Sequence, residues 1–169
     1  MNNIVAVFSS SRSNGNTEKL LTSIASIIGI DIINLSKYTF SEYDYDHKNQ
    51  DDDFLRLINK ILAYDKIIFA SPVYWYSVTP TMKKFLDRIS DLLELPNLLD
   101  TGRRLRGKTA YVLSSSVSEE VSSSFLGAFE ETFEYLGMVF GGYIHASCED
   151  GYQTENYAND LSRFTALFK

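Results

Sequence analysis

The stretch IVAVFSSSRSNGNTEKLL, residues 4–21, places a strand, a polar loop and a helix in direct succession. Residues 4–8 are all apolar, which is typical of a strand covered on both faces of a parallel sheet. Residues 9–17 hold serine, arginine, asparagine, glycine and threonine, and no acidic residue occurs before Glu18. From Leu20 onward, apolar residues recur at helical spacing. The stretch predicts a strand-to-helix unit of an α/β fold whose loop is rich in hydrogen-bond donors.

The same alternation of strands and helices continues through the rest of the chain. Apolar runs predict strands at residues 3–8, 30–35, 66–70, 108–113 and 138–146. Apolar residues at helical spacing predict helices at residues 16–28, 54–62, 79–93, 125–136 and 154–168. The buried faces of these helices are expected to include Ile27 and Leu93. Residues 36–53 are polar, acidic and rich in tyrosine, so we expect a long surface loop there, and residues 94–107 are expected to form a connector.

This pattern predicts a three-layer α/β architecture. A length of 169 residues is usual for one domain, so residues 1–169 are expected to form a single domain. Strands that alternate with helices predict a parallel sheet with helices on both faces. Because crossovers between parallel strands are right-handed, only a few topologies are possible. For five strands the favoured order is 2-1-3-4-5.

Charge and cysteine content exclude several classes of protein. The net charge of −6 argues against nucleic acid as a partner, because that partner calls for clustered lysine and arginine. Cys148 is the only cysteine, so no intrachain disulfide and no cysteine-based metal or iron–sulfur site can form, and no metal site is predicted. The first residues lack signal-peptide features, and no apolar run has the length of a membrane span. We expect a cytoplasmic protein that does not bind a membrane.

Two unusual loops are expected to meet at one edge of the sheet. In a sheet of order 2-1-3-4-5, ligands bind at the carboxyl ends of the strands, between strands 1 and 3. The loop SSSRSNGNT, residues 9–17, follows strand 1, and the loop SPVYWYS, residues 71–77, follows strand 3. A serine-rich loop that begins at residues 114–116 follows strand 4 and is expected nearby.

The chemistry of these loops points to a ligand with a phosphate and a flat ring. Free backbone N–H groups at the start of the first helix would attract an anion. That loop lacks both the P-loop lysine and the G-x-G-x-x-G pattern, so a phosphate monoester fits better than a nucleoside triphosphate or a dinucleotide. Pro72, Tyr74, Trp75 and Tyr76 suit a planar ring. A molecule with a phosphate at one end and a flat polar ring at the other would span both loops, and FMN is such a molecule. Each loop alone is also explained without a ligand, by helix capping or by an exposed interface patch, and their coincidence favours the ligand.

Both loops resemble the motifs of a known family. SSSRSNGNTEKL resembles the phosphate loop G-S-x-R-x-x-G-N-T-x-x-L of the NAD(P)H-dependent FMN reductases, and SPVYWYSVTPTMKKFLDR resembles their second motif. The resemblance implies a flavodoxin-like fold, FMN as cofactor and NADPH or NADH as co-substrate. It also implies which residues bind FMN: Ser10, Arg12, Asn14, Gly15, Asn16 and Thr17 at the phosphate, Pro72, Val73, Tyr74, Trp75 and Ser77 at the ring, and Ser114, Ser115 and Ser116 at its other side.

The chain departs from the family pattern at three places. Ser9 stands where relatives often have glycine, so the backbone is expected to approach the phosphate less closely. Tyr76 stands where many relatives have a small residue, and it is expected to narrow access to the ring. Some relatives carry a cysteine cluster in the segment that corresponds to residues 36–53, and its absence here excludes an iron–sulfur version.

No side chain is predicted to be catalytic. His47 lies in the acidic loop and is expected to be exposed, and His145 is expected to be a packed or rim residue. Cys148 is interpreted as an ordinary thiol, since no basic residue in the adjacent sequence would lower its pKa. The family motif also includes three residues that we interpret as surface and packing residues of the third helix, namely Lys83, Asp87 and Arg88.

These observations predict an FMN-dependent oxidoreductase that takes hydride from NAD(P)H and reduces a small acceptor such as a quinone, a flavin, or a nitro or azo compound. The alternative is a flavodoxin-type electron carrier that serves protein partners. A receiver domain and a low-molecular-weight phosphatase fit poorly, because the loops lack the acids of the first and the cysteine of the second. Exposed aromatic residues predict a homodimer or higher homo-oligomer. The sequence does not identify the acceptor or distinguish NADPH from NADH.

Overall fold

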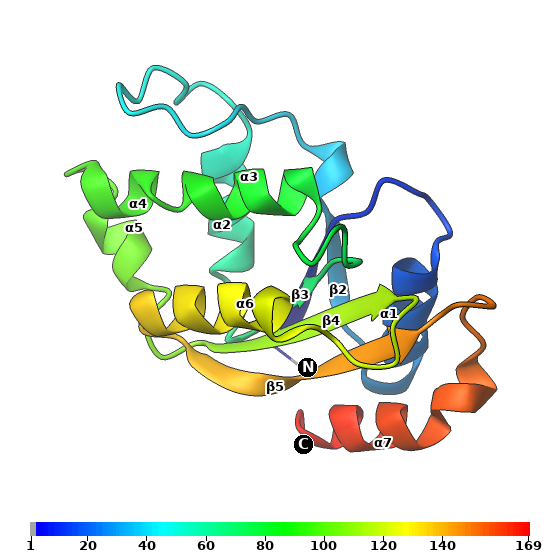
Figure 1. Ribbon diagram of the computed structural model, residues 1–169. Coiled ribbons are helices and arrows are strands. Elements are labelled where there is room, and N and C mark those ends of the chain that lie inside the picture. The colour runs from blue at the N-terminus through cyan, green and yellow to red at the C-terminus, as the bar shows by residue number, and fades with distance from the viewer. Residues whose placement is uncertain (1–2) are drawn as a thin grey trace.

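The fold is built on one parallel sheet. The computed structural model describes residues 3–169. Residues 1–2, which are part of the segment expected to lack signal-peptide features, lie outside the described residues. The strands lie in the order β2-β1-β3-β4-β5, as predicted (Figure 1). Their bounds are β1 Ile4–Phe8, β2 Asp31–Asn34, β3 Lys66–Ala70, β4 Thr109–Ser116 and β5 Val139–Ser147. The predicted flavodoxin-like topology is therefore confirmed.

Helices cover both faces of this sheet (Figure 1). The helices α1 (Asn16–Ile28) and α7 (Ala158–Ala166) pack on one face. The helices α2 (Phe54–Ile61), α3 (Pro80–Arg88) and α6 (Ser123–Tyr135) pack on the other face. The remaining helical segments are short: α4 is Asp91–Glu94, α5 is Leu99–Arg103, and two 3₁₀ turns are η1 Leu35–Lys37 and η2 Thr154–Tyr157.

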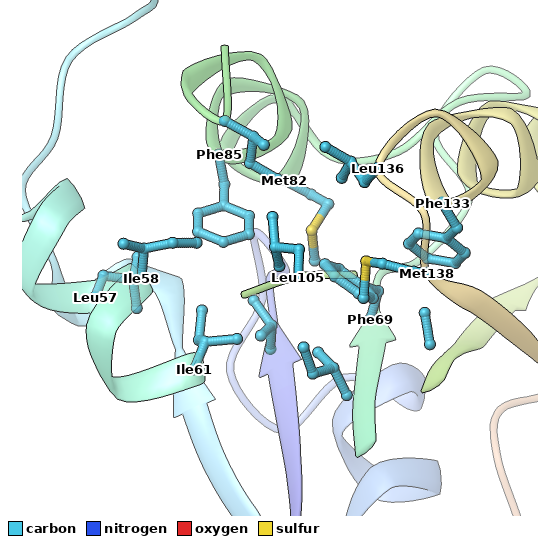
Figure 2. Close-up of a cluster of buried hydrophobic side chains, with 14 of the residues drawn as sticks. Leu57, Ile58, Ile61, Phe69, Met82, Phe85, Leu105, Phe133, Leu136 and Met138 are labelled. Carbon is cyan, nitrogen blue, oxygen red and sulfur yellow. The ribbon is translucent and has the colours of Figure 1, made fainter. Parts of the chain in front are cut away.

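The alternation of side chains along each strand explains why two helical layers form. Val5 and Val7 of β1 point into the core on the side of α2, α3 and α6, while Ile4, Ala6 and Phe8 point into the opposite core. Successive side chains of a strand lie on opposite faces, so a run of apolar residues needs cover on both. Figure 2 shows the larger core, where α2, α3 and α6 meet β3.

The predicted helix at residues 79–93 is interrupted. The helix α3 ends at Arg88, and 3₁₀-type bonds from Ile89 N–H to Leu86 O and from Leu92 N–H to Ile89 O connect it to α4. A 3₁₀ turn has fewer residues than an α-helical turn, so the residues after it point in directions that differ from those of a continuous α-helix. Leu92 is consequently buried and Leu93 is 40% exposed, contrary to the prediction. Ile27, also predicted to be buried, is 54% exposed because it lies at the last turn of α1.

The strand β4 is longer than predicted, and residues 114–116 belong to it rather than to a loop. The reason is pairing with β5, which continues through the pairs of Ser114 with His145 and Ser116 with Ser147. The connector expected at residues 94–107 contains the short helix α5, which packs against α4.

The acidic loop at residues 38–53 is held by Arg88, a packing residue of α3 whose side chain is fully buried. Its guanidinium donates to Asp91 at 2.8 Å, to Asp52 at 2.5 Å and to the carbonyl oxygen of Ser41 at 3.1 Å. His47 is not exposed as predicted, because its Nδ1 lies 2.9 Å from Asp91 Oδ1 and its side chain is only 17% exposed. The loop is therefore anchored at several points rather than free on the surface.

Replacing Gly141 by alanine should lower the free energy of unfolding by about 1–3 kcal/mol, the range for overpacking a core. Gly141 is the extra residue of a bulge in β5, opposite the step from Ala110 to Tyr111. A Cβ at this position would lie 2.4 Å from Cε1 of the buried Tyr111 ring. Thermal or urea unfolding measures the effect.

The matched control for this prediction is Gly127→Ala in α6. A Cβ at Gly127 would meet no atom within 4 Å, and alanine is favoured over glycine inside a helix by about 0.5–1 kcal/mol. The two variants should therefore shift stability in opposite directions. A stable Gly141→Ala variant would show that the Tyr111 ring moves freely, contrary to our expectation.

Candidate cofactor site

A cavity of about 650 Å³ lies where the loops after β1, β3 and β4 meet. This is the carboxyl edge of the sheet, at the reversal of strand order between β1 and β3 (Figure 1). Its volume falls within the range of small-molecule sites, about 300–1,000 Å³. Its walls include eleven of the fourteen predicted residues: Ser10, Arg12, Gly15, Asn16, Thr17, Pro72, Val73, Tyr74, Trp75, Ser115 and Ser116.

The start of α1 forms one end of the cavity. Gly15 is the N-cap of this helix and has no side chain, so no side-chain cap blocks the first amides of α1. Asn16 accepts a bond from Tyr152 N–H at 3.1 Å through Oδ1, which leaves its NH₂ group for a ligand. Unpaired amides and the positive end of the helix dipole attract an anion. This end of the cavity is therefore suited to a phosphate.

Buried hydrogen bonds tie the loops to one another. The hydroxyl of Ser9 lies 2.6 Å from that of Thr79, the N-cap of α3. The hydroxyl of Thr17 lies 2.7 Å from that of Ser115 on β4, and Val73 N–H donates to Ser115 O at 3.0 Å. In each hydroxyl pair only one hydrogen is used within the pair. The cavity walls are therefore set by contacts between segments far apart in sequence.

Tyr74 connects the second loop to the first. Its hydroxyl interacts with Ser11, and the hydrogen bond from the Ser11 side chain lowers the pKa of Tyr74, with a further contribution from the charge of Arg12. The sequence predicted that Tyr74 lines the ring. The structure places its hydroxyl at the first loop, so the same side chain reaches the end of the cavity suited to a phosphate.

Trp75 and Tyr76 form the tip of a tight turn at the mouth of the cavity. Tyr74 and Ser77 exchange backbone hydrogen bonds of 2.8 and 3.0 Å around them. Both tip residues have positive φ, 47° for Trp75 and 62° for Tyr76, as in a type I′ turn. They are 94% and 67% exposed. Two bulky aromatic residues in a conformation that favours asparagine and glycine are strained, and strain of this kind is often found at functional sites.

Replacing Tyr76 by asparagine should raise the free energy of unfolding by about 0.5–1 kcal/mol, because asparagine tolerates positive φ better than tyrosine. Chemical denaturation measures the change. The control is Tyr45→Asn: Tyr45 is 87% exposed and lies outside the positive-φ region, so this substitution should not stabilise the protein. Equal effects of the two substitutions would argue against strain in the turn.

The end of β4 and the start of the following loop form the third wall. Ser115 and Ser116 line the cavity, whereas Ser114 is fully buried and bonds to His145 at 2.8 Å behind the wall. Cys148 also lines the cavity, and burial raises the pKa of its thiol. This cysteine is therefore not activated as a nucleophile.

Three predicted residues do not line the cavity. Ser114 lies behind the wall, Ser77 lies at the base of the aromatic turn, and the backbone N–H of Asn14 donates to the Glu18 carboxylate at 2.6 Å. Tyr76 lines the cavity as well, in line with its expected place beside the ring. Seven other lining residues were missed, because they follow β4 and β5 in segments with no distinct motif. They are Val117, Ser118, Glu120, Ser122, Cys148, Glu149 and Gly151.

The residues present fit a phosphorylated flat heterocycle. Arg12, the Thr17–Ser115 pair and the open amides of α1 supply donors at one end. Pro72, Val73 and the aromatic turn supply apolar surface at the other. Within residues 3–169, no group of histidine, cysteine or carboxylate side chains could hold a metal ion. No helix in the same part of the chain is long and apolar enough to cross a membrane.

Comparisons with known proteins agree with this chemistry. The family model of the NADPH-dependent FMN reductases matches residues 2–150. A Bacillus subtilis protein, provisionally named NAD(P)H-dependent FMN-containing oxidoreductase YwqN, is 30% identical over 149 residues, which cover 83% of this chain and 82% of that protein.

Solved structures show the same fold. The Trp repressor binding protein from Bacillus subtilis is 26% identical, with a TM-score of 0.78 over 98% of this chain and 97% of the other. Two-electron reduced Megasphaera elsdenii flavodoxin is 13% identical, with a TM-score of 0.58 over 96% of this chain and 98% of the other. From the family match and the cavity together, we conclude that the chain belongs to the NADPH-dependent FMN reductase family and is an NAD(P)H-dependent enzyme whose cofactor is FMN.

Proposed function

We propose that the cavity binds FMN with its phosphate at the start of α1 and its ring between the aromatic turn and the end of β4. The observation that carries this proposal is one continuous cavity that joins an uncapped helix start to Trp75 and Ser116. FMN held there would supply the redox chemistry, in which hydride from NADPH or NADH reduces a second substrate. We propose the residues predicted from the sequence as the FMN site, with Asn14, Ser77 and Ser114 acting indirectly because they do not line the cavity.

The chain itself holds and shields the ring rather than supplying an acid or base. Trp75 and Tyr76 are exposed at the mouth of the cavity, where a nicotinamide or an acceptor would contact them. Two bulky aromatic side chains beside the mouth of the cavity favour flat, small molecules over large ones. We therefore propose a quinone, a flavin, or a nitro or azo compound as the acceptor.

The second candidate function is a flavodoxin-type electron carrier. It is favoured by the net charge of −6 and by the exposed aromatic turn beside the cavity, since a protein partner could dock there. Anaerobic mixing of the FMN-loaded protein with NADPH or NADH separates the candidates. Rapid bleaching of the flavin absorbance supports the reductase, and no reaction with either nucleotide would support the carrier.

The location of FMN is tested by binding and crystallography. The purified protein should be yellow and should release FMN on heating. Crystals grown with excess FMN and with the cavity open to solvent should show the phosphate at the α1 start. Electron density for FMN elsewhere, or an empty cavity, would contradict the proposal.

The proposal also covers organisation and assembly. We treat residues 1–169 as one domain, because both core clusters pack on the same sheet. The single cysteine is compatible with a cytoplasmic location. We further propose a homodimer or higher homo-oligomer in which Trp75 and Tyr76 contact a second copy. A molecular mass in solution equal to that of one chain, measured by gel filtration or light scattering, would contradict that assembly.

A further inference from the structure

The cavity wall formed by the end of β4 is held from behind by His145. This residue lies on β5 opposite Ser114 and does not itself line the cavity. Its Nδ1 lies 2.8 Å from Ser114 Oγ. Its Nε2 lies 3.2 Å from the carbonyl oxygen of Ser118 and 3.2 Å from Ser116 Oγ. One imidazole therefore contacts a buried strand residue and two residues of the cavity wall.

These contacts determine which ring nitrogen carries the hydrogen. A carbonyl oxygen only accepts hydrogen bonds, so the contact with Ser118 requires a hydrogen on Nε2. In the neutral imidazole Nδ1 is then an acceptor, and the buried Ser114 hydroxyl donates to it. Burial lowers the pKa of His145, although the bond to the Ser118 carbonyl opposes that shift, so the neutral form prevails at pH 7.

The state of His145 in turn orients the hydroxyl of Ser116. Ser116 Oγ accepts from Ser118 N–H at 3.1 Å and faces the Nε2–H of His145. With two donors directed at this oxygen, the hydrogen of the hydroxyl has to point elsewhere. Ser116 lines the cavity, and its hydroxyl is free to donate into it.

We propose that His145 is a positioning residue which, by directing its Nε2–H at the wall, presents the Ser116 hydroxyl as a hydrogen-bond donor to the polar edge of the FMN ring. The proposal rests on the location of FMN proposed above. His145 touches neither FMN nor substrate and acts only through Ser116. A reduced flavin ring is richer in electrons than an oxidised one, so a donor at its edge favours the reduced form.

A double-mutant cycle on the FMN-binding protein tests this proposal. Ser116→Ala should weaken FMN binding about 3–10-fold, as expected for loss of one neutral hydrogen bond. His145→Leu should weaken it to a similar extent, and the double variant should bind no more weakly than Ser116→Ala alone. Both single variants should also lower the midpoint potential of the bound flavin. Losses that multiply in the double variant would overturn the proposal.

Two further variants separate positioning from packing. His145→Gln keeps an N–H donor near the place of Nε2, and it should restore most of the affinity and potential lost in His145→Leu. Ser147→Ala removes a different bond to the same wall, from Ser147 Oγ to Val117 O at 3.4 Å, and should change FMN affinity less than twofold. If Gln fails to rescue or Ser147→Ala is equally harmful, His145 merely packs the wall.

The outcomes also distinguish this inference from the proposed function. If the unaltered protein does not bind FMN in the cavity, both are wrong. If it binds FMN in the cavity and Ser116→Ala leaves both affinity and potential unchanged, the proposed function stands and the inference about His145 is overturned.

Discussion

Replacing Arg88 by methionine should lower the free energy of unfolding by about 3–5 kcal/mol, the range for breaking a buried ion pair. Arg88 is fully buried and donates to two carboxylates, Asp91 at 2.8 Å and Asp52 at 2.5 Å, and its guanidinium also lies 4.7 Å from the ring of Phe54. Methionine keeps much of the volume but leaves both carboxylates without their cation. Urea unfolding at pH 7 measures the loss.

The loss should become smaller in acid. Burial raises the pKa of Asp52, but bonds from Arg88 and from the N–H groups of Phe54 and Ser41 outweigh it, so the pKa of this carboxyl is lowered. A lowered carboxyl pKa stabilises the folded state at neutral pH, and this stabilisation is lost as the pH falls through the ordinary value of about 4 and below. Arg88→Met should therefore differ less from the unaltered protein at pH 3 than at pH 7.

The matched control is Arg103→Met. Arg103 also pairs with an aspartate three residues away in sequence, Asp100, at 2.6 Å. The side chains are 61% and 94% exposed, however, so the pair contributes about 0–1 kcal/mol at most. Similar losses in the two variants would show that the burial of Arg88 does not produce the effect.

Replacing Arg12 by alanine should weaken FMN binding about 10–100-fold, the ratio expected for one charge-assisted hydrogen bond to a phosphate. Arg12 lines the cavity beside the uncapped start of α1. The affinity for riboflavin, which has the ring but no phosphate, should hardly change. Titration of the apoprotein, monitored by quenching of flavin fluorescence, measures both affinities.

Riboflavin is the internal control for this prediction, and Arg12→Lys is the matched variant. Lysine keeps the charge but not the forked donor geometry, so it should restore only part of the affinity. An equal loss of affinity for FMN and riboflavin would place Arg12 at the ring, and would contradict the proposed orientation of the cofactor.

Much of the fold could be predicted because the relevant signals are local. The apolar run of β1, the stop at Gly29 and the capping pair Thr79-Pro80 each identify an element from adjacent residues. The right-handed crossover leaves few strand orders, and the order favoured for five strands brings residues 9–17 and 71–77 together. The prediction that these two loops form walls of the cavity depends on this strand order.

Other features depend on contacts that no local pattern contains. Arginine is usually exposed, so nothing near Arg88 in the sequence indicated that it is buried with Asp52 and the backbone of residues 41 and 49. The same holds for His47, which reaches Asp91 from the acidic loop.

The sequence by itself determined the five strands and their order, and it located the two loops at the cavity, because apolar periodicity and chain connectivity are properties of neighbouring residues. Only the tertiary structure decided where the hydroxyl of Tyr74 lies, that Ser114 faces His145 instead of the cavity, and that Cys148 completes a wall. The physical reason is that these positions are set by hydrogen bonds and packing between segments whose register is established only when the sheet is assembled.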